Sequence, residues 1–522
     1  MSITWRKGAV LTAALALAVT ACAPPTADDA APAPAPAPEA PDAPESGGRL
    51  VLARTGDIDN LDPHRATAFQ TRQTLELVFD TLIELAPDLS LRPGLAESWQ
   101  FSADGLQLTF ELREATFHDG SSLTADDVVA TIERLLDEES GAVARANLLS
   151  IDAVSATGPR TVVLDLNNPD ATLPTSLADA NTAILSAAAI EADTVGSAPS
   201  GTGPFVFEDW QQGQAVLLSA FDDYWGGRPF FDELQLRVIP DEASVLAGLR
   251  AGQFQVGVLN DPTVVTQIDE SQLEVFRNPA LAYRALMLNN DRGPLADARV
   301  RQAISCAIDR EELVETVMFG EGQVTGPFSI PAFASDPYDG LPCDGRDLDV
   351  ARALLDEAGQ SAGFSLETIV ITGGYDTAIN EAQSLQAQLA EIGVDLQLEI
   401  LETNVYVQRW LATDFDAAVA LNGGRPDPHQ KYNRYFTSTG NLNQVATHSS
   451  DILDELFEAG RTETDPAERV RIYAQISREL LEASPWAWLF TGFEYRVLDP
   501  ALTGFEPDST GSLKSLRQVR LG

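Results

Sequence analysis

Lysine is nearly absent from this sequence of 522 residues, in which Lys7, Lys431 and Lys514 are the only examples. Lysine and arginine together number 34 against 78 aspartate and glutamate residues, so the formal net charge is -44. A protein that binds nucleic acid or an anionic membrane surface needs a basic patch that displaces counterions. The composition therefore argues against nucleic acid as a partner and indicates a well-solvated acidic surface.

The sequence also lacks the common catalytic motifs. It contains no G-x-S-x-G elbow, no H-E-x-x-H helix and no G-x-x-x-x-G-K-[ST] phosphate loop. With 78 acidic side chains, a pair of carboxylates gives no information about acid–base chemistry. We therefore expect no enzyme activity, no cofactor and no metal, with a secreted hydrolase as a remote alternative. The four histidines are isolated, and each is expected to be a turn or surface residue: His64, His118, His429 and His448.

The N-terminus carries an export signal. Arg6 and Lys7 precede the apolar run Ala9–Val19, which is too short to span a membrane. The run ends in Val19-Thr20-Ala21-Cys22, which resembles a bacterial lipobox, in which the cysteine becomes the lipidated first residue of the mature protein. We expect a lipoprotein signal peptide at residues 1–21 and an extracytoplasmic protein anchored through Cys22. An ordinary signal peptide with an incidental cysteine is the alternative.

Two further expectations follow from export. Residues 22–47 alternate alanine and proline with acidic residues, a composition that favours an extended linker between lipid and folded protein. Cys306 and Cys343 remain as an even pair in an oxidising compartment, so we expect a disulfide between them.

The most informative stretch is Leu91–Leu136. Asp104-Gly105 can reverse the chain, and the residues after it alternate between apolar and polar. Thr124 and Asp127 have the spacing of a capping box that opens a helix. The stretch therefore predicts a hairpin, a turn and a capped helix. The apolar face of the expected strand is Leu106, Leu108, Phe110 and Leu112.

Strands and helices alternate in the remaining chain, which predicts a mixed α/β fold with a largely covered sheet. A strand is expected at Leu50–Ala53, followed by a loop that contains Asn60 and by helical spacing from Thr71 to Leu85. Further strands are expected at 151–166 (two strands), 234–238, 283–289, 366–371, 394–400 and 415–420, and helices at 349–358, 379–392 and 465–481.

Three stretches resemble the bacterial extracellular solute-binding protein family 5, which holds oligopeptide, dipeptide and nickel receptors of ABC importers. They are residues 91–136, the sequence GTGPF at 201–205, and NNDRGPLADARVRQAISCAIDREEL at 289–313. The resemblance implies an α/β, two-lobe periplasmic-binding-protein fold with an extra subdomain inserted in the first lobe. It also implies a two-segment hinge near residues 280 and 488. The implied division is lobe I at 48–90, 200–281 and 489–522, the inserted subdomain at 91–199, and lobe II at 282–488.

The candidate ligand loop is Leu421–His429, which follows an expected strand. Ligands of α/β sheets favour such loops, and Gly423 and Gly424 let the backbone approach a ligand. In peptide-binding relatives this loop carries an aspartate at the position of Gly424, which pairs with the peptide ammonium. Arg425 stands beside that position here and could hold a carboxylate or phosphate through two hydrogen bonds, or form an internal salt bridge. The candidate ligand-binding residues are Asn60, Tyr283, Asn422, Gly423, Gly424, Arg425, Asp427 and Trp488.

These features predict a lipid-anchored, monomeric receptor that captures a peptide or peptide-like small solute between two lobes and delivers it to the permease subunits of an ABC importer. A carboxylate-bearing non-peptide solute, such as a sugar acid or an opine-like compound, is the alternative. A nickel chelate is the third possibility, because Asp427-Pro428-His429 resembles the loop of some nickel-binding members, although one histidine cannot hold a metal alone. An adhesion or chaperone-like surface protein is a rival of a different class.

We predict that mass spectrometry of the membrane-extracted protein will show a mature chain that begins at an acylated Cys22. The Cys22→Ala variant should stay unprocessed or be released from the membrane, because no thiol is left to carry the lipid. A mature chain that begins elsewhere and carries an unmodified Cys22 would contradict the prediction.

Overall fold

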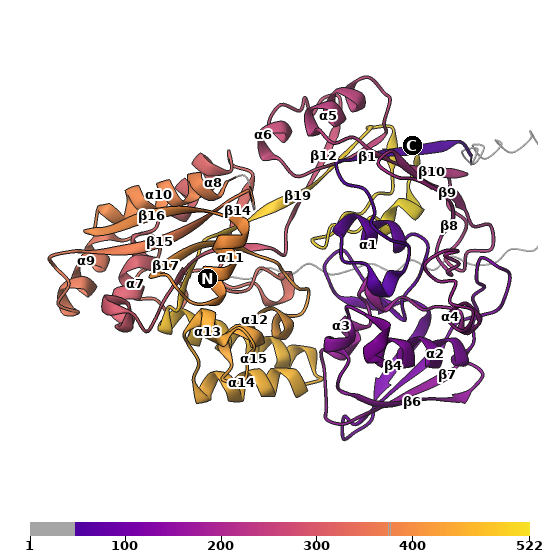
Figure 1. The fold of residues 1–522 in the computed structure, drawn as a ribbon, viewed down its shortest axis with the longest axis horizontal. Helices are drawn as coiled ribbons and strands as arrows, with labels where there is room; N and C mark the ends of the chain where they lie inside the picture. Colours follow the sequence, from indigo (N-terminus) through magenta and orange to yellow (C-terminus); the bar gives the residue numbers. More distant parts are fainter. Residues whose placement is uncertain (1–46, 374, 376) are drawn as a thin grey trace, which may run out of the picture. The chain divides into compact units, whose positions relative to one another are not determined.

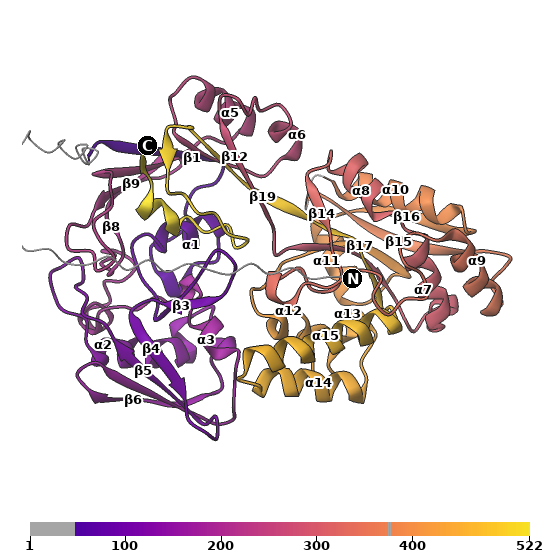
Figure 2. The same cartoon turned by 180° about the vertical axis from the view of Figure 1, so that it is seen from behind.

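The computed structural model describes residues 47–373, 375 and 377–522 (Figures 1 and 2). The expected signal peptide, Cys22 and the linker up to residue 46 lie outside the described residues. The described strands form sheets of eight, five and four strands and two small two-stranded sheets. This mixed α/β architecture agrees with the predicted fold class.

The eight-stranded sheet is assembled from distant parts of the chain. β1 (Arg49–Arg54) lies within it, parallel to both β10 (Glu233–Val238) and β11 (Val256–Leu259). Leu50 and Leu52 pack into one core cluster and Ala53 into another, so both faces of β1 are covered. The other strands are β8 (Phe205–Gln211), β9 (Ala215–Ala220), β12 (Glu274–Pro279), β19 (Phe490–Leu498) and β14 (Gly322–Val324), which pairs with β19.

The five-stranded sheet has the order β16-β15-β17-β13-β18. β13 (Tyr283–Leu288) is buried along its whole length. Leu286 and Leu288 pack toward α7–α10, whereas Tyr283 and Met287 pack toward α12, α14 and α15. Successive side chains of a strand point to opposite faces of the sheet, so β13 contributes to two separate hydrophobic cores, one on each face. The other strands are β15 (Phe364–Thr372), β16 (Val394–Glu402), β17 (Ala417–Asn422) and β18 (Trp486–Trp488).

Helices cover these sheets (Figure 1). In the first part of the chain they are α1 (Phe69–Leu75), α2 (Ala125–Leu136), α3 (Leu173–Ser176), α4 (Ala187–Glu191), α5 (Glu242–Arg250) and α6 (Pro262–Val265). Around the five-stranded sheet they are α7 (Ala298–Ala307), α8 (Arg310–Val317), α9 (Leu348–Glu357), α10 (Ala378–Ala390), α11 (Thr403–Leu411), α12 (Pro428–Phe436), α13 (Asn443–Ala446), α14 (Asp451–Thr462) and α15 (Pro466–Ala483).

The four-stranded sheet contains the stretch that the sequence singled out. The capping box of Thr124 and Asp127 is present at the start of α2, and Leu108 and Phe110 are fully buried. Leu106 is the exception, because the strand begins only at Gln107 and leaves its side chain exposed. The strands are β4 (Ala96–Phe101), β5 (Gln107–Leu112), β6 (Ile151–Gly158) and β7 (Thr161–Leu166), in the order β4-β5-β7-β6.

The helix expected over Thr71–Leu85 is wrong in its second half. α1 ends at Leu75, and β2 (Ile83–Leu85) pairs with β3 (Leu91–Pro93). The segment between them pairs instead with the GTGPF sequence: Gly203 N donates to Val78 O at 2.9 Å and Phe205 N donates to Leu77 O at 3.0 Å. A Cβ at position 203 would overlap this backbone, so the glycine makes the pairing possible.

The chain passes from the large sheet to the five-stranded sheet through residues 280–282, between β12 and β13. It returns at Leu489, between β18 and β19. These two crossings lie where the hinge was expected. The strands of the five- and four-stranded sheets lie within 282–488 and 91–199, whereas the eight-stranded sheet also takes β14 from within 282–488. The expected division into lobes and subdomain stays a prediction.

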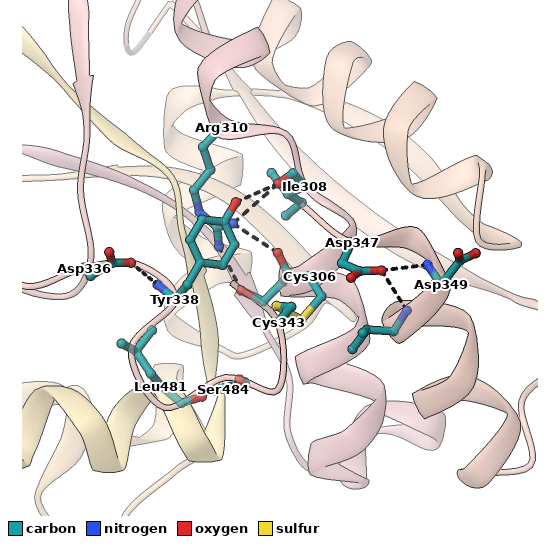
Figure 3. The surroundings of a disulfide bond; sticks show 12 residues. Cys306, Ile308, Arg310, Asp336, Tyr338, Cys343, Asp347, Asp349, Leu481 and Ser484 are labelled. Atoms are coloured by element: carbon teal, nitrogen blue, oxygen red, sulfur yellow. Dashed lines mark hydrogen bonds between the residues drawn. A yellow bond between two sulfur atoms is a disulfide. The ribbon is translucent and has the colours of Figure 1, made fainter. Parts of the chain in front are cut away.

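A disulfide links Cys306 at the end of α7 to Cys343 in the long connection before α9. Figure 3 shows how Tyr338 of this connection lies against Arg310, whose guanidinium is 4.5 Å from the ring centre. The Tyr338 hydroxyl donates to the Ile308 carbonyl at 3.2 Å. The covalent link and these contacts hold the connection on the helical layer.

No helix in the described part of the chain is long and apolar enough to cross a membrane.

We predict that removing the disulfide in a Cys306→Ala/Cys343→Ala variant lowers the free energy of unfolding by about 4 kcal/mol, because the 37-residue separation closes a long loop in the unfolded chain. Chemical denaturation with and without reductant measures this. Reductant should destabilise the wild type and leave the variant unchanged. Two thiols that titrate in the unfolded, non-reduced wild type would contradict the prediction.

Candidate functional site

The loop Gly423–Asp427 is positioned by a strand before it and a helix after it. β17 ends at Asn422, and α12 begins at Pro428 with Asp427 as its N-cap. Asp427 accepts a hydrogen bond from His429 N at 2.8 Å, and proline suits the first turn of a helix because its missing N–H is not needed there. The strand end and the capped helix together fix both ends of the loop.

Gly424 allows this loop to pack against the crossing between the two sheets. A Cβ at position 424 would overlap the backbone carbonyl of Leu281. Gly423 has open space around the position of a Cβ, so its backbone faces a cavity and not another chain segment. The glycine pair therefore serves two purposes, close packing at 424 and an unobstructed backbone at 423.

Two adjoining cavities lie beside this loop. The first, cavity A, has a volume of about 340 Å³ and reaches Leu281 and Ala282. The second, cavity B, has a volume of about 440 Å³ and reaches Lys431 and Arg434 of α12. The cavities share part of their walls, so we treat them as one cleft. The shared residues are Arg72, Asn147, Ser176, Asp179, Gly423, Gly424, Arg425 and Gln430.

The wall opposite α12 comes from residues 66–76 and 143–181. The two walls touch beside the cleft, where Gln430 Nε2 donates to Ser176 Oγ at 2.7 Å. Further along, Arg461 Nη1 donates to Pro169 O at 2.9 Å, and Ala171 N donates to Arg461 O at 2.7 Å. Segments separated by more than 250 residues therefore enclose a common space.

Cavity B is lined by four cations and one carboxylate. The carboxylate is that of Asp179, which also accepts a hydrogen bond from Asn181 N at 2.9 Å. Among the described residues, none of the four cations has a carboxylate oxygen within 4.0 Å. This includes Arg425, for which an internal salt bridge was the alternative. The four cations are Arg72, Arg425, Lys431 and Arg434.

Lys431 is the most buried of these cations, with 3% of its surface exposed. Its ammonium group donates to Ser329 Oγ at 2.9 Å and lies 4.4 Å from the centre of the Tyr283 ring. Burial lowers the pKa of Lys431 to about 7. Lys431 was not among the ligand-binding residues predicted from the sequence. The rarity of lysine, with three in the whole sequence, was the one signal that could have pointed to it.

Cavity A has a more balanced charge. Its walls carry Arg72 and Arg425 together with Glu76, Asp179 and Glu494. Glu76 accepts hydrogen bonds from Leu513 N at 2.6 Å and from Ser512 Oγ at 2.9 Å. Burial raises the pKa of Glu76 to about 7, so this carboxyl is only partly ionised at neutral pH. The two ends of the cleft therefore differ in polarity.

The structure brings three of the predicted ligand residues to the cleft, namely Gly423, Gly424 and Arg425. Asn422 lies behind them, and its side-chain nitrogen has no partner among the described residues. Tyr283 is buried and lines neither cavity, and its ring centre lies 4.4 Å from the ammonium group of Lys431.

The other predicted ligand residues do not line the cleft. Trp488 is buried and donates to the Tyr432 hydroxyl at 2.9 Å. Asp427 is 1% exposed and forms an ion pair with Arg469 at 2.7 Å. Asn60 lies beside a different pocket and accepts a hydrogen bond from Asp62 N. In this structure these three side chains are committed to packing, helix capping and local turns.

No group of three or more metal-ligating side chains is found among the described residues. In the Asp427-Pro428-His429 sequence, the aspartate is held by Arg469 and the histidine Nε2 is 3.0 Å from Asn433 Nδ2. The two side chains that suggested a nickel loop are therefore occupied with internal contacts.

The comparisons with known proteins agree with this architecture. Residues 90–444 match the family described as bacterial extracellular solute-binding proteins, family 5 Middle. The chain is 26% identical over 502 residues to the oligopeptide-binding protein AppA of Bacillus subtilis, which covers 89% of this chain and 90% of the relative.

Two solved structures are also similar. HbpA2 from Haemophilus parasuis has a TM-score of 0.84 and 26% identity, covering 91% of this chain and 100% of that chain. AgaA from A. tumefaciens R10, solved in complex with agropinic acid, has a TM-score of 0.72 and 28% identity, covering 91% and 99%.

We predict that Lys431→Met stabilises the ligand-free protein, because it removes a buried charge that has no counterion in the described structure. The pKa of Lys431 falls from 10.5 to about 7 on folding, so the folded state binds fewer protons between these values and wild-type stability rises with pH there. The gain should be largest below pH 7, at most about 5 kcal/mol, and should shrink toward pH 10.

Thermal melts from pH 5 to 10 measure this gain. Lys514→Met is the matched control, since the Lys514 ammonium pairs with Asp80 at 2.9 Å and Glu84 at 2.6 Å. That variant should be destabilised because buried Asp80 loses its cation, while Glu84 keeps Arg517 at 2.9 Å and Arg92 at 3.2 Å. A melting temperature of Lys431→Met below that of the wild type at pH 6 would show that the lysine stabilises the fold.

Proposed function

This chain belongs to family 5 of the bacterial extracellular solute-binding proteins, and we propose that it captures a peptide or peptide-like small solute and delivers it to an ABC importer. In this proposal the protein is anchored through a lipid on Cys22, acts as a monomer outside the cytoplasm, and has no catalytic role. The linker before residue 47 would give the receptor reach from the membrane to the permease subunits.

The observation that carries the proposal is the cleft between loop 423–426 with α12 on one side and residues 66–76 and 143–181 on the other. Its volume suits a small solute, and polar groups converge on it from both walls. A ligand held by both walls would exchange water for fixed hydrogen-bond partners, and affinity would come from closing the walls around it.

The two crossings at residues 280–282 and at Leu489 are the proposed hinge. Rotation there would move one wall relative to the other while the strand pairing within the five-stranded sheet is kept. Leu281 also lines cavity A, so a hinge movement would change the cleft directly. Family relatives that bind peptides, such as the oligopeptide-binding protein AppA, support the peptide class of ligand.

A carboxylate-bearing non-peptide solute is the second candidate. It is favoured by the four cations of cavity B, for which the described residues offer no ion-pair partner. The similarity to AgaA, whose structure holds agropinic acid, adds support of the same kind. Both candidates require an anionic group on the solute near Arg425.

We predict that Arg425→Ala weakens binding of the retained solutes by at least about tenfold, which is 1.4 kcal/mol, because a carboxylate loses its two-point partner. The measurement is native mass spectrometry of the wild type with a random tetrapeptide library and a panel of sugar acids, followed by calorimetry on the solutes retained. The melting temperature of the ligand-free variant should stay within a degree or two of the wild type, since Arg425 is exposed.

Arg237→Ala serves as the control, because it removes an exposed arginine on β10 that has no ion-pair partner among the described residues. It should leave affinity unchanged. A wild type that retains no solute from either panel would argue against the proposed function. Retention of peptides that is insensitive to Arg425→Ala and to C-terminal amidation would argue against anion selection by Arg425.

A further inference from the structure

Lys431 is a buried cation that the folded chain leaves uncompensated. Of the three possible hydrogen bonds of its ammonium group, the described residues supply one, to Ser329 Oγ at 2.9 Å. The aromatic faces of Tyr283 and Tyr432, at 4.4 and 5.4 Å, supply weak additional attraction. Lys431 also lines cavity B, and its ammonium group has two further donors without a partner among the described residues.

This arrangement is unusual for a protein with 78 acidic residues. The other lysine in the described chain, Lys514, is partly buried, with 14% of its side chain exposed, and it is neutralised by Asp80 and Glu84. A buried charge without a partner costs several kcal/mol unless something compensates it. The neighbours of the Lys431 ammonium group are Ser329 and Tyr283, and neither carries a negative charge. The missing counterion could therefore be an anionic group of a ligand.

We infer that Lys431 is the centre of an anion-binding subsite in cavity B, which holds a second acidic group of a ligand whose first acidic group lies at Arg425. This inference rests on the proposed function and narrows its ligand class to solutes with at least two carboxylates, such as acidic peptides or dicarboxylic acids. Arg434, exposed on the same helix and lining the same cavity, would attract the anion at the cavity entrance.

The protonation state of Lys431 makes the subsite dependent on pH. Burial lowers the pKa of Lys431 to about 7, and an anion at the ammonium group would raise it again. The groups in contact with Lys431 do not titrate in the same range, because burial raises the pKa of Tyr283 and of Tyr432 well above 10 and Ser329 is uncharged. Glu76 of the adjoining cavity A does titrate there, since burial raises its pKa to about 7, so the loss of the pH dependence in Lys431→Met is what assigns the effect to Lys431. Of the remaining charged residues of cavity B, three are arginines and the fourth is Asp179.

The test compares dicarboxylates with monocarboxylates of equal length, from succinate against butyrate to pimelate against heptanoate. This series varies the distance between the acidic groups without assuming a geometry. Binding is measured by calorimetry at constant ionic strength, at pH 6 and pH 9. We expect at least one dicarboxylate to bind the wild type at pH 6 at least about tenfold more tightly than its monocarboxylate. We expect the preference to shrink at pH 9.

Lys431→Met should abolish this preference at pH 6, and Arg434→Gln, at an exposed position, should reduce it without affecting the fold. Arg237→Met, which removes an exposed charge that lines neither cavity, should retain it. A wild type without any dicarboxylate preference would overturn the inference. A preference that survives Lys431→Met would overturn it as well. In either of these cases, solutes retained from the tetrapeptide and sugar-acid panels would support the proposed function and contradict only the Lys431 subsite. If the panels yield no retained solute, the proposed function itself is contradicted.

Discussion

The cleft depends on one close approach, that of Gly424 to the carbonyl of Leu281. This contact places the end of the five-stranded sheet directly against a crossing between the two large sheets, and a side chain at 424 would overlap that backbone. Because Leu281 and Ala282 also line cavity A, the same contact connects the ligand loop to the segment about which the walls are proposed to move. A substitution at Gly424 would therefore alter both the ligand loop and the crossing at residues 280–282.

The ammonium group of Lys431 lies against Tyr283 and Tyr432, which belong to a cluster of buried aromatic side chains. Tyr283, Tyr432, Trp486 and Trp488 pack edge-on or tilted against one another, with ring centres 5.4 to 6.5 Å apart. Aromatic neighbours offer the ammonium group of Lys431 no strong hydrogen-bond acceptor, which raises the cost of its unpaired charge. The low polarity around Lys431 would also strengthen its attraction to a bound carboxylate. The burial of this charge therefore lowers the stability of the free protein and favours binding of an anion.

Much of the fold could be predicted because its signals are local. The capping box at Thr124, the alternation of β16 and the helix α10 each depend on neighbours within a few residues. The prediction failed where a distant segment competed: Leu77 and Val78 read as helix but pair with the GTGPF backbone. For the site, the position of the loop with Gly423 and Arg425 after a strand was predictable, and its role in ligand binding stays a prediction. Trp488 and Asp427 were also predicted to bind the ligand; Trp488 lies in the core and Asp427 caps a helix.

The sequence by itself determined the α/β class, the family resemblance and the loop that faces the cleft, because each rests on residue order over short spans. Only the tertiary structure decided which charges meet and which stay unpaired. Asp427 and Arg469 are 42 residues apart and form an ion pair, while Lys431, four residues from Asp427, has no carboxylate partner in the described chain. Charge pairing depends on distances through space, and those follow from how the sheets and helices pack.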